Sequence, residues 1–134
     1  MPDAPNASVE PDAPDRSMPA AISKAVVGLM HGYTGRGPTS ARTTIGTDMI
    51  VVTLRDCLTK AERRLAHNGH AVEMLALRRV VQDTMREDLI RAVETLTGRT
   101  VEAFLGDNLT DPDIAVEIFL MDRSGHNGAH PERT

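Results

Sequence analysis

The sequence predicts a single α+β domain in the order α-β-β-α(α)-β-β, with an antiparallel sheet and helices on one face. Two stretches place apolar residues three and four positions apart, as the buried side of a helix requires. Shorter stretches alternate apolar and polar residues, as half-buried strands do. The 134 residues suffice for one core, which must be aliphatic because aromatic residues make up only 2% of the chain.

The first helix is expected to begin at Pro19, where a missing N–H does no harm, after a cap at Ser17 or Met18. Its apolar stripe has steps of three and four residues: Ile22, Val26, Leu29 and Tyr33. It is expected to end within the stretch GYTGRGPTSART, residues 32–43, where Pro38 blocks continuation.

Four strands are expected, in two pairs. The first pair covers 39–46 and 48–56, with a tight turn at 46–48. The second pair covers 99–106 and 114–122, joined by the turn-rich loop DNLTDPD. The second strand of the first pair places three aliphatic residues on one side: Ile50, Val52 and Leu54.

Between the two pairs lies a long helical region. Thr59 and Glu62 form a capping box that begins a short helix, which Asn68-Gly69 interrupts. A second helix is expected over about 70–97, with this apolar stripe: Met74, Leu77, Val81, Met85, Leu89, Ala92 and Leu96. Such a helix spans about 40 Å, well beyond one small core. Its excess apolar length predicts a homodimer.

Composition assigns the chain to a broad class. Residues 1–18 are predicted to be a disordered, acidic, Pro/Ala-rich tail, 19–122 the folded domain and 123–134 a flexible tail. The net charge of −4 and the lack of a basic, aromatic face argue against a nucleic-acid partner. Neither a signal peptide nor a run long enough to span a membrane is evident, so we expect a cytoplasmic protein without direct membrane insertion.

The glycine-rich stretch is the candidate ligand- or partner-binding site, through Gly35, Arg36, Gly37, Pro38 and Arg42. It is no phosphate loop, because it leads from a helix into a strand and contains no lysine. One interpretation is a helix stop and a turn, in which the arginines neutralise the helix end. The other is that the arginines bind a small oxyanion or a partner's carboxylate. The residues alone leave both open.

The other candidate metal-binding and catalytic residues are weaker. His67, His70 and Glu73 are spaced as metal ligands could be on a helix, but Asn68-Gly69 lies between them, so no metal site is predicted. The lone Cys57 is expected to be a small buried hydrophobe. With no cofactor motif and no catalytic residues in evidence, we expect no enzyme. The alternative is a small enzyme that uses Cys57 or a histidine in a dimer cleft.

The chain resembles the MpsC-like family, formerly a bacterial domain of unknown function, over roughly 20–122. The markers occur in order along the chain: Gly35-Arg36-Gly37-Pro38, Arg42, Asp48-Met49, Leu58-Thr59 to Glu62, and Leu96-Thr97-Gly98. The resemblance implies an accessory protein of a system that couples membrane potential to inorganic-carbon (bicarbonate) supply and whose other parts are membrane proteins. It supplies no catalytic residues, and it favours a contact role for the loop, with bicarbonate as one suitable oxyanion.

Overall fold

The computed structural model describes residues 17–123. Within this range the chain forms three helices and a four-stranded antiparallel sheet in the strand order β1-β2-β4-β3. The elements are α2 (Met18–Thr34), β1 (Ser40–Ile45), β2 (Met49–Arg55), α3 (Lys60–His67), α4 (Ala71–Thr97), β3 (Val101–Thr110) and β4 (Asp113–Met121). The predicted α+β class and element order are therefore confirmed. The predictions for 1–16 and 124–134 lie outside the described residues.

The helix ends follow local chemistry. Ser17 caps α2 by accepting the N–H of Ala20 at 3.3 Å, so the helix begins one residue earlier than expected. Thr59 and Glu62 form the predicted capping box of α3, each side chain accepting the backbone N–H of the other. Gly98, with a φ of 70°, ends α4 in the left-handed conformation that glycine adopts without strain.

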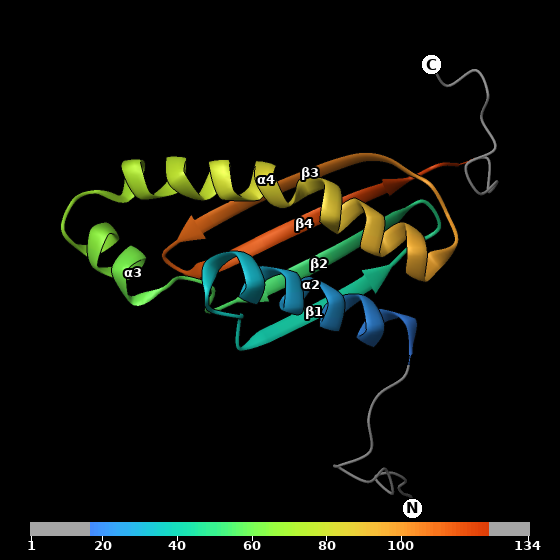
Figure 1. Cartoon of the computed structure of the whole chain (residues 1–134), viewed down its shortest axis with the longest axis horizontal. Coiled ribbons are helices and arrows are strands. Elements are labelled where there is room, and N and C mark those ends of the chain that lie inside the picture. Colours follow the sequence, from blue (N-terminus) through green and yellow to red (C-terminus); the bar gives the residue numbers. More distant parts are fainter. Residues whose placement is uncertain (1–16, 124–134) are drawn as a thin grey trace, which may run out of the picture.

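Both long helices cover the same face of the sheet. Figure 1 shows α2 and α4 side by side in front of the four strands, and α3 packs on α4. The core between the two layers includes Ile22, Val26 and Met30 of α2, Met85, Leu89 and Val93 of α4, and Val52, Leu54 and Phe119 of the sheet. The predicted inward face of β2 is confirmed, since Ile50, Val52 and Leu54 are all buried.

The helix stripes differ from the prediction. In α2 the third buried residue is Met30, whereas Leu29 and Tyr33 lie toward α4. In α4 the buried positions are Met74, Arg78, Gln82, Met85, Leu89 and Val93. Leu77, expected in the stripe, is 53% exposed. The apolar pattern missed Arg78 and Gln82 because their side chains are polar, although they lie at steps of four from Met74.

The last hairpin is longer than predicted. The segment expected as a loop, DNLTDPD, contributes 107–110 to β3 and Asp113 to β4, so that Thr110 pairs with Asp113 across a two-residue turn. The polar residues misled the prediction because β3 lies at the edge of the sheet, where polar side chains reach water without cost.

The face of the sheet opposite the helices is mostly aliphatic on β4 and β3 and mixed on β1 and β2, where Arg42, Thr53 and Arg55 lie on it. We call it the outer face. Its positions on the two central strands and on β3 include Val51, Ile114, Val116, Ile118, Leu120, Leu105 and Leu109. These side chains are half-buried or exposed, and Leu105 and Leu109 are each 55% exposed. Within residues 17–123 the two helices that pack on the sheet do so on its other side (Figure 1).

Candidate functional site

The Arg-Gly-Pro loop ties the end of α2 to the segment after β2. Gly35, with a φ of 79°, donates its N–H to the His31 carbonyl at 2.8 Å and ends the helix. Arg36 Nη2 lies 2.7 Å from one Asp56 carboxylate oxygen, and Arg63 Nη2 lies 3.1 Å from the other. The Arg36 guanidinium holds the pKa of Asp56 below its usual value. Arg36 therefore has an internal counter-ion.

The remaining loop residues pack against α2. Gly37 and Pro38 are half-buried between Arg36 and β1. A Cβ atom on Gly37 would lie 3.4 Å from Val27 Cγ1, so the loop backbone runs close along the helix. This close approach gives Gly37 a packing role that is separate from any contact with a ligand.

Arg42 lies in different surroundings. Its neighbours on β1, Ala41 and Thr43, face the helices, and Thr43 Oγ1 lies 2.8 Å from Ser23 Oγ. Alternation along the strand places the exposed Arg42 side chain on the outer face. Among residues 17–123, Arg42 has no ion pair and shares no partner with Arg36. The two arginines of the predicted site are thus not brought to one common group.

The segment after β2 is held by two other elements. Asp113 of β4 accepts the backbone N–H groups of Cys57 and Leu58, both at 3.1 Å. Arg78 of α4, which is 3% exposed, donates Nη2 to the Cys57 carbonyl at 2.8 Å and lies 3.6 Å from a Glu62 carboxylate oxygen. These contacts fix where α3 leaves the sheet. The sequence analysis did not identify Arg78 or Asp113, because no motif accompanies them.

Cys57 is a buried thiol. Burial, followed by the charge of Asp113, raises the pKa of Cys57 to about 12. A thiolate is the reactive form of cysteine, and this environment disfavours it at neutral pH. The expectation of a small buried hydrophobe is confirmed, and Cys57 is a poor nucleophile in this setting.

The three weak metal candidates lie at the α3–α4 junction. His67 is the last residue of α3, and His70 is the N-cap of α4, with Nδ1 3.7 Å from Glu73 Oε1. His67 faces a hollow that it shares with Lys60 and Arg63, an unfavourable setting for a cation. In the described part of the chain, no group of three or more His, Cys, Asp or Glu side chains is placed to hold a metal ion.

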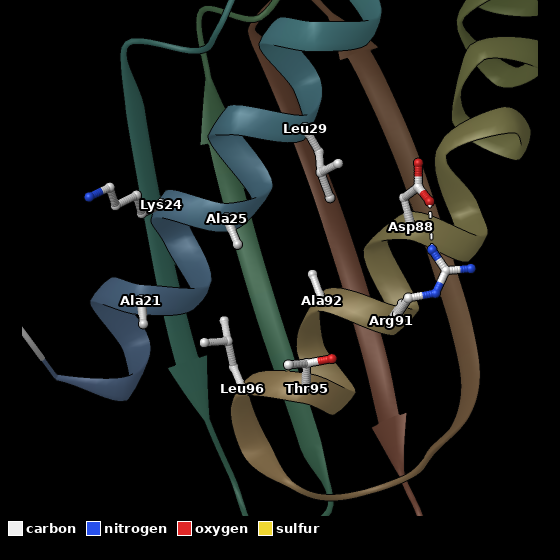
Figure 2. Close-up of a pocket in the computed structure, with 9 residues that line it drawn as sticks. All are labelled: Ala21, Lys24, Ala25, Leu29, Asp88, Arg91, Ala92, Thr95 and Leu96. Carbon is white, nitrogen blue, oxygen red and sulfur yellow. Dashed lines mark hydrogen bonds and ion pairs between the residues drawn. The ribbon is translucent and has the colours of Figure 1, made fainter.

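A groove runs between α2 and α4 on the side away from the sheet. Its volume is about 620 Å³. Small and aliphatic side chains line it: Ala21, Ala25 and Leu29 from α2, and Ala92 and Leu96 from α4. Figure 2 shows Leu29 and Leu96 pointing into the space between the two helices. The sequence analysis missed this groove, although the spacing of Ala21 and Ala25 by one helical turn was a readable signal.

The charged residues of the groove lie on both helices. Asp88 accepts a hydrogen bond from Tyr33 at 2.7 Å and from Arg91 at 3.0 Å, and the bond from Tyr33 leads in lowering the pKa of Asp88. Lys24 extends outward from α2 (Figure 2). With two cations, Lys24 and Arg91, against one acid, the groove carries a small positive excess.

A polar cluster is buried between α4 and the sheet. Gln82 Nε2 donates to Glu117 Oε1 at 2.5 Å, and Gln82 Oε1 accepts from Asn108 Nδ2 at 3.1 Å. Glu117 is 1% exposed, and burial raises its pKa to about 8. A Cβ atom on Gly106 would collide with Gln82 Nε2 and lie 2.5 Å from Glu117 Oε1. Gly106 therefore leaves the room that this cluster needs.

No helix within residues 17–123 has the length and apolar character that crossing a bilayer requires.

Comparison with known proteins identifies the family. The chain matches the family described as "Na+-translocating membrane potential-generating system (MpsC)" over residues 15–123. One relative is the uncharacterized protein YbcI of Bacillus subtilis (strain 168), which is 32% identical over 108 residues that cover 78% of this chain and 86% of the relative. No solved structure matches the chain significantly. The family match spans every described helix and strand, and the chain therefore belongs to the MpsC family, which is named for a Na⁺-translocating membrane potential-generating system.

Proposed function

We propose that this protein is a non-enzymatic, cytoplasmic accessory component of a Na⁺-translocating membrane potential-generating system and that it acts by binding a membrane component. The family supports the association with such a system. The observation that supports the binding role is the apolar groove between α2 and α4. A link to inorganic-carbon (bicarbonate) supply is part of the proposal and rests on the family resemblance described above.

The groove fits one kind of occupant, an amphipathic helix from a cytoplasmic segment of the membrane component. Helices pack at axis separations of about 8–10 Å, and small side chains allow the closer approach. Ala21, Ala25 and Ala92 provide such small side chains, while Leu29 and Leu96 offer apolar contact. A helix lying between two others is a recurrent form of peptide recognition. The positive excess from Lys24 and Arg91 favours an acidic edge on this helix.

Site-specific photo-crosslinking in cells tests the proposal. The photoreactive residue p-benzoylphenylalanine replaces Ala25, which lines the groove, or Ala76, which is exposed on α4 about three helical turns before the nearest groove residue. We expect a crosslink to an integral membrane protein from the position of Ala25, identified by mass spectrometry, and none from the position of Ala76. Equal crosslinking from both positions, or none from Ala25 at normal protein abundance, would contradict the groove as the binding site.

A further inference from the structure

The outer face of the sheet has an ordered arrangement of side chains. The strand register aligns residues from all four strands in rows across the sheet. The central rows are Thr44, Val51, Ile118 and Leu105, and then Arg42, Thr53, Val116 and Asp107. The second of these rows has a cation at one edge of the sheet, an acid at the other edge and uncharged residues between them.

No helix within residues 17–123 covers the outer face. Four strands about 4.8 Å apart and seven residues at about 3.3 Å each give the whole face a projected area of roughly 400 Å². The aliphatic side chains within this area lie side by side on β2, β4 and β3: Val51, Leu105, Leu109, Ile114, Val116, Ile118 and Leu120. An exposed apolar patch of a few hundred Å² with a polar rim is typical of an interaction surface.

The chain's own tails are poor candidates to cover this face. Residues 1–16 and 124–134 include only Met1 and Val9 as large aliphatic side chains, and the rest are small, polar, charged or proline. Covering a sheet face of valine, isoleucine and leucine requires apolar side chains that can pack into it. The identical face of a second copy supplies them.

We propose that two copies of this chain stack sheet on sheet through their outer faces, with Arg42 of each copy paired to Asp107 of the other. The two-fold axis lies parallel to the strands, between β2 and β4. Because the strand order is β1-β2-β4-β3, this rotation places β1 over β3 of the second copy and β2 over β4. It preserves position along the strands, so Arg42 and Asp107, which share a row, face each other across the interface.

The dimensions allow this contact. Packed sheets lie about 10 Å apart and are rotated by about 30°. An edge strand lies about 7 Å from the axis. The rotation of about 30° therefore displaces its residues by about 4 Å relative to the facing strand. An arginine side chain and an aspartate side chain together span this offset. The aliphatic rows at the centre, around Val51 and Ile118, are displaced least and form the dry part of the interface.

The contacts that Asp107 makes within its own chain do not compete strongly with a pairing to Arg42 of a second copy. Asp107 Oδ1 accepts the backbone N–H of the adjacent Asn108 at 2.8 Å and lies 3.8 Å from Arg79 of α4. The Asp107 and Arg79 side chains are 79% and 68% exposed. Exposed ion pairs of this kind stabilise a protein weakly. Asp107 is therefore free to bind Arg42 of a second copy, and Arg79 remains beside it as an additional cation.

Sedimentation equilibrium of the full chain, compared with variants at two equally exposed leucines, tests whether the outer face forms the dimer. Leu105 on the outer face is 55% exposed, and Leu77 on α4 is 53% exposed. The wild type should be a dimer. Leu105→Lys should weaken dimerisation roughly 100-fold or more, because the two-fold symmetry buries two unpaired lysines. Leu77→Lys should leave the dimer unchanged, and circular dichroism should show both variants folded. A monomeric wild type at all accessible concentrations, or a dimer lost only in Leu77→Lys, overturns the proposal.

Charge reversal at Arg42 and Asp107 tests the position of the proposed two-fold axis. Arg42→Asp and Asp107→Arg should each weaken dimerisation about tenfold, because each creates two pairs of like charges in every dimer. The double variant R42D/D107R should restore the wild-type dissociation constant. Arg79→Gln, which removes only the ion pair of Asp107 with α4, is the control and should change dimerisation little. Additive losses in the double variant overturn the proposed pairing of Arg42 with Asp107.

Discussion

Glu117 is a carboxyl group that the fold buries between α4 and the sheet, beside Gln82. Burial raises its pKa to about 8, while the hydrogen bond from Gln82 and the charge of Arg78 act in the opposite direction. The folded protein therefore holds this proton across much of the range in which an unfolded chain releases it. The protonated carboxyl can remain in the core with Gln82 as its partner, and ionisation costs the folded state free energy.

This burial predicts that stability falls as the pH rises from about 5 to 8. Between the ordinary carboxyl pKa of 4.5 and the folded value of about 8, the folded state binds more protons than the unfolded state. The free energy of unfolding should then decrease by at most about 1.4 kcal/mol per pH unit, and the decrease should end above pH 8. Urea unfolding at pH 5.5, 7 and 8.5 measures it. Glu117→Gln should remove most of the slope, and an equal slope in that variant would contradict this account.

Gly106 is predicted to be a position that tolerates no side chain. Gly106→Ala forces Gln82 away from Glu117, so the variant should lose about 1–3 kcal/mol of stability from overpacking and a broken buried hydrogen bond. Gly28→Ala is the matched control, since Gly28 lies inside helix α2 with open space around it. That change should stabilise the protein by about 0.5–1 kcal/mol through helix propensity. Thermal unfolding of both variants measures the contrast, and equal effects would be evidence against the packing argument.

At the scale of elements, the Arg-Gly-Pro loop joins α2 to the segment between β2 and α3. Arg36→Gln removes one of the two arginine partners of Asp56, whose φ of 61° is unusual for a residue other than glycine, and leaves Arg63 as the other. We predict a lower melting temperature for Arg36→Gln and an unchanged one for Arg42→Gln, because Arg42 makes no internal ion pair within residues 17–123. Differential scanning calorimetry compares them, and equal melting temperatures would show that the Arg36–Asp56 contact does not stabilise the fold.

A contact between this loop and a small anion stays a separate prediction. Isothermal titration of the wild type with bicarbonate should give a binding heat that Arg36→Gln diminishes. Phosphate serves as a comparison for a less selective anion site. A wild type without any binding heat would leave the loop with its structural role alone.

The elements themselves were largely predictable, because caps and periodicity are local. Ser17, the capping box at Thr59 and the terminal glycines are readable from a few residues of sequence, and the structure places helix ends there. The buried polar positions were not predictable, since the partners of Arg78 and Gln82 come from distant segments: Cys57, Glu62 and Glu117. The same limit applies to the groove and to the outer face. Each depends on how helices and strands far apart in sequence pack together.

The predicted helix dimer illustrates the point. The stripe of α4 suggested an interface, yet Met85 and Leu89 are 2% and 0% exposed inside the protein's own core. A charge at either position would therefore unfold the chain rather than separate two copies. Val72, Leu77 and Val80 of α4 stay exposed, but the surface that we propose for the dimer lies on the strands, where alternation gives both faces aliphatic side chains.

At the scale of the whole molecule, the two proposed binding surfaces lie on opposite sides of the sheet. The helix layer, which carries the groove, covers one side of the strands, and the outer face lies on the other side (Figure 1). A dimer through the outer faces would leave both grooves open. One assembly could then hold two membrane components, and loss of the dimer and loss of groove binding can be measured separately.

The most direct test of the proposed function is the Na⁺-dependent membrane potential of cells that lack this protein, measured with a voltage-sensitive dye. Wild type and Gly28→Ala should restore the potential in these cells. Ala25→Trp, which fills the groove without touching the core, should fail to restore it at equal protein abundance. Full restoration by Ala25→Trp, or an undiminished potential in cells without the protein, would contradict an accessory role exercised through the groove.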